Sequence, residues 1–244
     1  MGKKEWEIID WFVLMCIIIL LSIGTYQRNV HWNSEIELWK DCVKKSPQKE
    51  RVHHNLGYAY YELEQLDKAQ EEFGEALRLN PRYALSMYNL GLVFYRKGLM
   101  GEAIDFYKKA IELDPKFPDS LYNLGLTYYQ KGLYRKAIQV YKELSVMKPE
   151  YKNVYHLLGL SYIKLRQWDN AIQAFLEELK YHPESYDNLI FLGKIYRELK
   201  IYPTALQYYK EVLAYSNIPE KDKIQKTIAA IEKVQKKQTG KEEN

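Results

Sequence analysis

Three asparagine side chains recur at a fixed interval of 34 residues, at Asn55, Asn89 and Asn123. A side-chain amide both donates and accepts a hydrogen bond, so it can pair with the N–H and C=O groups of a peptide whatever the sequence of that peptide. The series ends there, because Leu157 and Phe191 occupy the next two places at this interval. A row of amides at one interval is therefore chemically suited to pairing with an extended polypeptide backbone.

Tyrosines accompany these asparagines at the same interval. Tyr88 and Tyr122 directly precede two of the asparagines, and a further tyrosine stands six residues after each of the three. A tyrosine ring offers an apolar face and a hydroxyl tip, which suits an extended peptide or a glycan. The candidate peptide-binding residues are Asn55, Asn89, Asn123, Tyr61, Tyr88, Tyr95, Tyr122 and Tyr129.

The same interval governs the whole chain from Glu50 onward. A glycine and an alanine at fixed places leave space where two helices cross, and aromatic residues at helical spacing fill the surroundings. One helix pair cannot bury its apolar face alone, so neighbouring pairs must stack. The repeated residues are Gly57, Gly91, Gly125, Gly159 and Gly193; Ala69, Ala103, Ala137, Ala171 and Ala205; Phe73, Tyr107, Tyr141, Phe175 and Tyr209; and Pro81, Pro115, Pro149 and Pro183.

This pattern resembles the tetratricopeptide repeat (TPR), a helix–turn–helix unit. The resemblance implies an all-α, right-handed TPR superhelix (an α-solenoid) of five units, 50–83, 84–117, 118–151, 152–185 and 186–219. It also implies that positions 2, 5, 6, 9, 12 and 13 of each unit face a concave groove, which is where the asparagines and tyrosines above fall. The asparagines resemble the ladder with which the repeats of O-GlcNAc transferases hold peptide backbone. The alternative is that asparagine is simply frequent at this place in the family, and that the tyrosines only cover the groove.

Both ends of the array are expected to differ from the repeats, because a solenoid needs polar ends. The pattern of residues 220–237, with one apolar stripe among lysines, predicts a capping helix. The polar residues 238–244 are expected to form a disordered tail. Residues 28–49 predict a juxtamembrane half-repeat, in which Ser34 and Glu37 form a capping box. The apolar face of this half-repeat helix is Ile36, Trp39 and Val43.

The N-terminal residues 1–27 have a different composition. No charged side chain occurs from Trp11 to Gln27, and the run is long enough for one helix to cross the hydrocarbon of a bilayer, about 30 Å. We therefore expect a single transmembrane helix. A cleaved secretory signal is the alternative, since Lys3 and Lys4 precede the run and small residues lie near Gly24. Lysines and arginines occur on both sides of the run, so they do not decide the orientation of the helix.

The junction between this segment and the repeats resembles the C-terminal tails of bacterial proteins similar to the transmembrane-and-tetratricopeptide O-mannosyltransferases. The residues that carry the resemblance are Arg28, Asn29, Trp32, Glu35, Leu38, Trp39, Asp41, Ser46, Pro47 and Arg51. The resemblance implies a glycosylation-linked context with the repeats on the extracytoplasmic (periplasmic) side of the membrane. It does not imply activity here, because such enzymes carry their acidic catalytic residues between several earlier membrane helices.

Other chemistries find little support. The five histidines, His31, His53, His54, His156 and His182, form no spacing typical of a metal site or a catalytic triad, and no glycine-rich phosphate loop occurs. The family pattern places His53 at a packing position and His54 at a groove position. The cations that grip an acidic C-terminus in the carboxylate clamp of some TPR proteins are missing. The net charge of +4 is spread over 36 basic and 32 acidic residues, so we expect no nucleic-acid partner.

We therefore expect a membrane-anchored TPR scaffold that binds a protein or an extended peptide, without catalysis, cofactor or metal. One alternative is an accessory or truncated part of a membrane glycosyltransferase system, which presents acceptor polypeptide to a polytopic partner enzyme. The other alternative is a soluble periplasmic adaptor that is released by cleavage.

Overall fold

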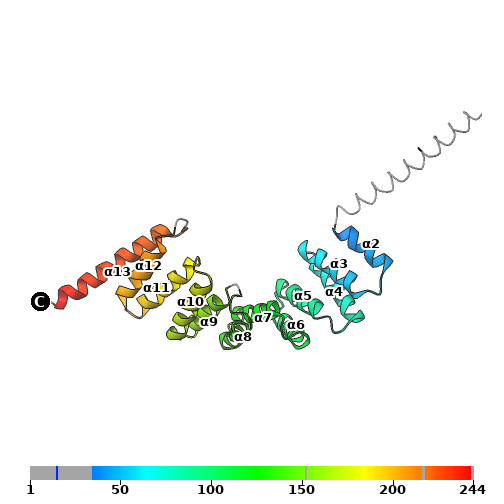
Figure 1. Cartoon of the computed structure of the whole chain (residues 1–244), viewed down its shortest axis with the longest axis horizontal. Helices are drawn as coiled ribbons and strands as arrows, with labels where there is room; N and C mark the ends of the chain where they lie inside the picture. Colours follow the sequence, from blue (N-terminus) through cyan, green and yellow to red (C-terminus); the bar gives the residue numbers. More distant parts are fainter. Residues whose placement is uncertain (1–14, 16–34, 152, 216–217, 243–244) are drawn as a thin grey trace, which may run out of the picture. The chain divides into compact units, whose positions relative to one another are not determined.

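The computed structural model describes residue 15 and residues 35–151, 153–215 and 218–242, which form twelve helices from α2 onward and no strand (Figure 1). The helices are α2 (Glu35–Lys45), α3 (Glu50–Glu62), α4 (Leu66–Leu79), α5 (Ala84–Arg96), α6 (Met100–Leu113), α7 (Pro118–Gln130), α8 (Tyr134–Met147), α9 (Val154–Lys164), α10 (Trp168–Tyr181), α11 (Tyr186–Glu198), α12 (Tyr202–Val212) and α13 (Lys221–Glu242). The predicted all-α fold of TPR helix pairs is confirmed.

The chain divides into two compact units, Met1–Leu113 and Asp114–Asn244, which we term the N-terminal and C-terminal units. Within the N-terminal unit α3 packs with α4 and α5 with α6; within the C-terminal unit the pairs are α7 with α8, α9 with α10 and α11 with α12. The predicted transmembrane helix lies outside the described residues, apart from Met15. Among the residues that are described, no helix has the length and apolar character needed to span a membrane.

The repeated glycines lie where the two helices of a pair cross. A Cβ atom on Gly91 would stand 2.5 Å from Cε1 of the Tyr107 ring, and Tyr107 is fully buried. Each of the other four pairs has the same arrangement, with an aromatic ring of the second helix within 2.9 Å of the added atom. The helices approach this closely only because glycine has no side chain, which is the physical reason for the 34-residue glycine pattern.

Helix α2 packs on the first full repeat. Ile36 is buried against α3, in a cluster that includes Leu56 and Tyr60, and Trp39 and Val43 pack against the same cluster. The apolar face predicted for the half-repeat helix is therefore the face that packs. Ser34, the proposed first residue of the capping box, is outside the described part of the chain.

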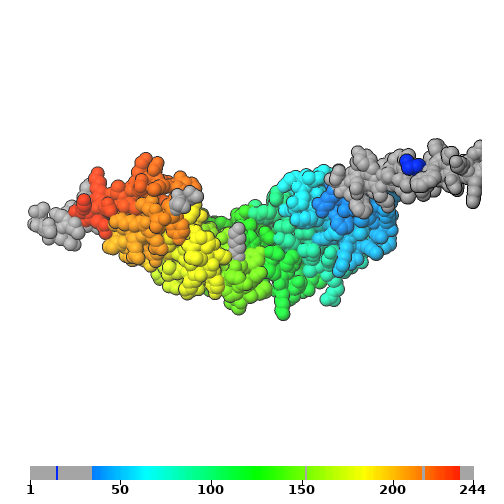
Figure 2. Space-filling model, turned by 45° about the horizontal axis from the view of Figure 1, so that its top comes forward, coloured from blue at the N-terminus to red at the C-terminus, as the bar shows by residue number. Residues whose placement is uncertain are grey.

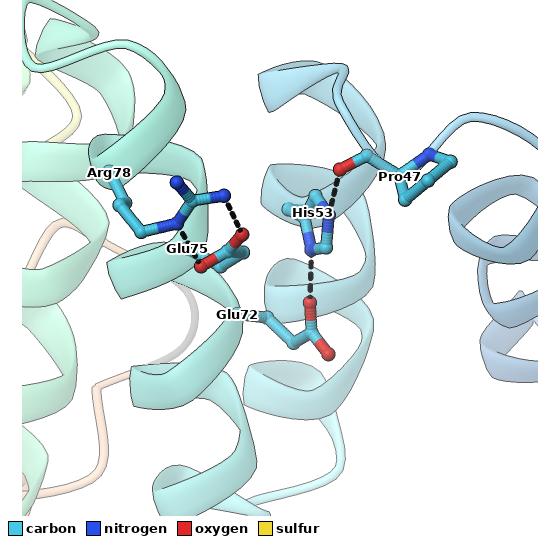
Figure 3. Close-up of polar contacts among 5 residues, drawn as sticks. All are labelled: Pro47, His53, Glu72, Glu75 and Arg78. Carbon is cyan, nitrogen blue, oxygen red and sulfur yellow. Dashed lines mark hydrogen bonds and ion pairs between the residues drawn. The ribbon is translucent and has the colours of Figure 1, made fainter.

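His53 joins three segments of the N-terminal unit (Figure 3). Its Nδ1 lies 2.7 Å from a carboxylate oxygen of Glu72 on α4, and its Nε2 lies 3.0 Å from the carbonyl oxygen of Pro47, in the loop between α2 and α3. Each ring nitrogen of His53 therefore faces an oxygen atom, one on α4 and one in the loop. His53 thus ties the α2–α3 loop to α4.

At the other end, α13 packs against α12, and Figure 2 shows the two as adjoining orange and red regions. Ile224, Ile228 and Ile231 of α13 are buried. This is the apolar stripe expected of the capping helix. The helix runs to Glu242, five residues beyond its predicted end, so residues 238–242 are helical rather than part of a disordered tail. These residues contain no proline, and each residue added to an existing helix gains a backbone hydrogen bond.

Candidate functional site

Four tyrosines gather in the N-terminal unit: Tyr61 on α3, Tyr88 and Tyr95 on α5, and Tyr107 on α6. The Tyr107 hydroxyl is buried and has no hydrogen-bond partner among the described residues. Burial raises the pKa of Tyr107 well above its ordinary value, and the nearby Tyr88, Tyr61 and Tyr95 raise it further. We call these four residues the tyrosine surface, with Tyr107 as its floor and three partly exposed rings around it.

A cation borders the tyrosine surface. The guanidinium of Arg96 lies 5.6 Å from the centre of the Tyr61 ring and also pairs with the carboxylate of Glu64. Tyr61 and Glu64 together raise the pKa of Arg96. Tyr58 lies one turn before Tyr61 on α3, with ring centres 6.4 Å apart, and is 43 % exposed. The surface therefore combines aromatic faces, hydroxyl groups and one positive charge, which suits a polar polypeptide with aromatic or carbonyl groups.

The asparagines of the N-terminal unit differ in depth. Asn55 on α3 is partly exposed, whereas Asn89 on α5 is only 5 % exposed. An amide ladder for a bound peptide needs both side chains at the surface, so within this unit Asn55 is the better placed of the two.

In the C-terminal unit the predicted residues are Tyr122, Asn123 and Tyr129 on α7. The Asn123 amide donates to the carbonyl oxygen of Asp119 one turn earlier, at 3.0 Å, and is partly exposed. The Tyr129 ring meets the ring of Tyr134 edge-on, at 5.4 Å between centres. All three side chains thus already have neighbours within their own repeat.

Tyr122 also lines a pocket of about 690 Å³ that the sequence did not reveal. Its ring is 5.5 Å from the ring of Tyr151, whose hydroxyl donates to the carboxylate of Asp119. The Lys148 ammonium lies 5.7 Å from the centre of the Tyr151 ring. The lining residues are Tyr122, Lys148, Glu150, Tyr151 and Asn153. The one sequence feature that could have indicated this pocket is the aromatic residue Tyr151 at the last position of the third repeat.

The two histidines at repeat position 5 contact the next repeat, and His54 is buried although the family pattern places it in the groove. His54 is 5 % exposed, its Nδ1 lies 2.9 Å from the hydroxyl of Ser86 on α5, and burial lowers its pKa to about 4. His156 has the same relation to Asn188, with 2.7 Å between Nδ1 and Oδ1. The groove assignment of His54 is wrong, because the first helix of the next repeat packs over this position.

A second buried polar group is Glu178, fully buried at repeat position 27, where other repeats carry Ala, Leu or Val. Its carboxylate accepts from the backbone N–H of His156, at 3.1 Å, in the first turn of α9. Asn153 precedes α9 in a left-handed conformation and makes no side-chain cap. Glu178 therefore caps α9 from the neighbouring helix, where the positive end of the helix dipole also favours a carboxylate. The described residues include no group of three or more metal-ligating side chains.

The comparisons with known proteins agree with this architecture. The family model described as tetratricopeptide repeat matches residues 54–118 and 156–219, which is more than half of the chain, and a model described as anaphase-promoting complex, cyclosome, subunit 3 matches residues 96–178. The chain therefore belongs to the tetratricopeptide repeat family, as the 34-residue pattern predicted.

Two curated relatives are O-mannosyl-transferases. Protein O-mannosyl-transferase TMTC3 of Homo sapiens is 25 % identical over 79 residues, 32 % of this chain and 9 % of the relative. Protein O-mannosyl-transferase F38B6.6 of Caenorhabditis elegans is 28 % identical over 67 residues, 28 % of this chain and 10 % of the relative. The predicted resemblance to this group is thus confirmed. The match spans only about a tenth of the length of these relatives.

Among solved structures, the crystal structure of YrrB, described as a TPR protein with an unusual peptide-binding site, superposes with a TM-score of 0.65. It is 18 % identical, and the match covers 73 % of this chain and 92 % of that chain. At this identity the likeness concerns the fold alone.

Proposed function

We propose that this chain is a TPR scaffold that binds an extended peptide of a partner protein on the tyrosine surface of its N-terminal unit, without catalysis of its own. The observation that carries the proposal is the gathering of Tyr61, Tyr88 and Tyr95 around the buried Tyr107, beside the cation of Arg96. Hydroxyl groups donate and accept, so they can pair with both polar groups of a peptide backbone. Partly exposed rings add apolar contact area at a small cost in side-chain entropy.

The residues proposed for peptide binding also include Asn55 on α3 and, in the C-terminal unit, Tyr122, Asn123 and Tyr129. Asn55 supports backbone pairing because its amide is partly exposed. Tyr122 supports a second contact region because it lines an open pocket. Asn89 is proposed only as a floor residue of the groove, since little of it is exposed.

Peptide-array binding to the full chain in non-ionic detergent tests the proposal. Tyr61→Phe with Tyr95→Phe removes two hydroxyls and keeps both rings, so we expect about tenfold weaker binding of captured peptides with an unchanged melting temperature. The matched control is Tyr196→Phe with Tyr208→Phe, a stacked pair in the C-terminal unit. Equal affinities of the two double variants would refute the role of the tyrosine surface.

We also propose that residues 1–27 anchor the scaffold as a single transmembrane helix with the repeats on the extracytoplasmic side. The uncharged run from Trp11 to Gln27 supports the anchor. The mass of the mature N-terminus separates this arrangement from a cleaved, soluble adaptor, and protease treatment of intact cells tests the side. Protection of the repeats in intact cells would contradict the orientation.

The second candidate function is an accessory part of a membrane glycosyltransferase system that presents acceptor polypeptide. The two O-mannosyl-transferase relatives favour it. A photoreactive residue at Tyr122 in the native cells would test this function. Cross-linking to a polytopic glycosyltransferase or to its acceptors would support it, and cross-linking to neither would argue against it.

A further inference from the structure

A second pocket, of about 430 Å³, lies in the C-terminal unit between the end of α11, the start of α12 and the capping helix α13. It is lined by Arg197, Tyr202, Lys223, Lys226, Thr227, Ala230, Ile231 and Val234. We term it the basic pocket. It shares no residue with the tyrosine surface or with the pocket at Tyr122.

The charge of the basic pocket has one sign. Its lining includes Arg197, Lys223 and Lys226, and no acidic residue among those that are described. Glu198 contacts Arg197 at 3.4 Å and Glu220 contacts Lys223 at 3.0 Å, but both carboxylates stand outside the lining. Such exposed pairs are weak and are screened by salt, so a ligand carboxylate can compete for these cations.

The floor of the basic pocket is apolar. Ala230, Ile231 and Val234 lie close together on α13; Ile231 is buried, whereas Ala230 is exposed and Val234 is 41 % exposed. Tyr202 adds an aromatic ring from the start of α12. A capping helix that only closed the core would gain nothing from an exposed valine beside three cations.

We propose that the basic pocket binds an acidic peptide segment of a partner protein, in which aliphatic or aromatic side chains are flanked by carboxylates. The apolar side chains fit on Ala230 and Val234, and the carboxylates pair with Arg197 and Lys226. The planar guanidinium of Arg197 can hold a carboxylate through two parallel hydrogen bonds, which a lysine cannot do. The apolar residues between the cations favour a peptide over a flat anionic membrane, which needs only surface lysines.

Fluorescence anisotropy with the full chain in non-ionic detergent tests this site. The probe is a labelled, end-blocked hexapeptide with the sequence Asp-Glu-Phe-Leu-Glu-Asp. One comparison peptide carries Asn and Gln in place of the acids, and another carries Gly in place of Phe and Leu. We expect the first change to weaken binding at least about tenfold, because both charge-assisted contacts are lost. The second change should weaken binding several-fold, because the floor contact is lost.

The double variant Arg197→Gln with Lys226→Gln should also weaken binding about tenfold. Its matched control, Lys131→Gln with Lys164→Gln, removes the same charge from exposed positions elsewhere in the unit and should change affinity less than about twofold. Thermal melting of both variants excludes a folding defect. Tyr61→Phe with Tyr95→Phe should leave this binding unchanged, which separates the basic pocket from the proposed peptide surface.

Three results would overturn the proposal. The first is no binding of the acidic hexapeptide. The second is equal affinity of the Arg197→Gln, Lys226→Gln variant and its control, the Lys131→Gln, Lys164→Gln variant, for the hexapeptide. The third is binding of mixed phosphatidylserine micelles that depends on Arg197 and Lys226 while the hexapeptide does not compete, since this would assign the pocket to a lipid surface.

Discussion

The Nδ1 atom of His54 lies 2.9 Å from the hydroxyl oxygen of Ser86, which stands 32 residues later in the next repeat. The imidazole also lies against the rings of Phe73 and Tyr83, at 5.4 and 5.1 Å between centres. This contact joins two repeats through a buried polar group. It therefore couples the stacking of the N-terminal unit to the protonation of one side chain.

The first prediction concerns pH. Burial lowers the pKa of His54 from 6.5 to about 4, so the unfolded chain binds its proton more readily than the folded chain. The contribution of the neutral, buried His54 to the free energy of unfolding is therefore fully present above about pH 6.5 and is lost as the pH falls towards 4. Between pH 7 and pH 5 the free energy of unfolding should fall by at most about 2 kcal/mol from this group.

Urea unfolding at the two pH values measures this effect. His54→Gln keeps a polar side chain that cannot be protonated, so the variant should show a correspondingly smaller loss between pH 7 and pH 5. The same pH dependence in both proteins would show that His54 does not titrate as its burial requires.

The second prediction concerns the helix crossing at Gly91. Gly91→Ala places a Cβ atom 2.5 Å from the buried Tyr107 ring and should lower the free energy of unfolding by about 1 to 3 kcal/mol. Gly74→Ala is the control, because Gly74 lies in α4 with nothing within 4 Å of the added atom. That change should stabilise the protein by about 0.5 to 1 kcal/mol. Effects of the same sign in urea unfolding would contradict the crossing geometry.

The third prediction concerns the cap of α9. Glu178→Leu suits the apolar surroundings but removes the acceptor of the His156 N–H, so it should lower the free energy of unfolding by about 1 to 2 kcal/mol. Glu178→Gln retains an acceptor oxygen and should cost less. Amide hydrogen exchange in the first turn of α9 should be faster in the leucine variant only. A leucine variant as stable as the wild type would rule out the cap.

The fourth prediction concerns His53, which ties the α2–α3 loop to α4. A double-mutant cycle of His53→Ala and Glu72→Ala should give a coupling energy of about 1.5 to 3 kcal/mol, as for hydrogen bonds to charged groups. His53→Ala should also speed hydrogen exchange in α2. The neighbouring pair of Glu75 and Arg78 on α4 is exposed to solvent and provides a control cycle with little coupling (Figure 3). Similar coupling energies in the His53–Glu72 and Glu75–Arg78 cycles would contradict a specific link between the α2–α3 loop and α4 through His53.

The repeat architecture could be predicted from the sequence because it depends on local size and spacing. Gly91 and Tyr107 are paired by their positions within one repeat, and each repeat is a helix pair of nearly the same length. The apolar faces of α2 and α13 were predictable for the same reason, since helical periodicity alone determines which residues share a face.

The proposed peptide-binding surface was predictable only in part. Tyr61, Tyr88 and Tyr95 were recognised by their interval, and the structure brings them around Tyr107, which the sequence indicated only as a packing residue. Asn89 and His54 fall at groove positions of the family pattern but are buried. Their exposure depends on how closely the next repeat packs, and that distance is not encoded in the position within one repeat.

The sequence by itself determined the helix pairs, their order and their crossing residues, because these follow from periodicity and from the size of side chains at fixed places. Only the tertiary structure decided which polar groups meet across repeats. His54 reaches Ser86 of the next repeat, and Arg197 lines one pocket with Lys226 and Val234 of the capping helix, through contacts between helices that do not belong to the same repeat. Such contacts depend on the three-dimensional approach of whole helices, which small differences in packing change.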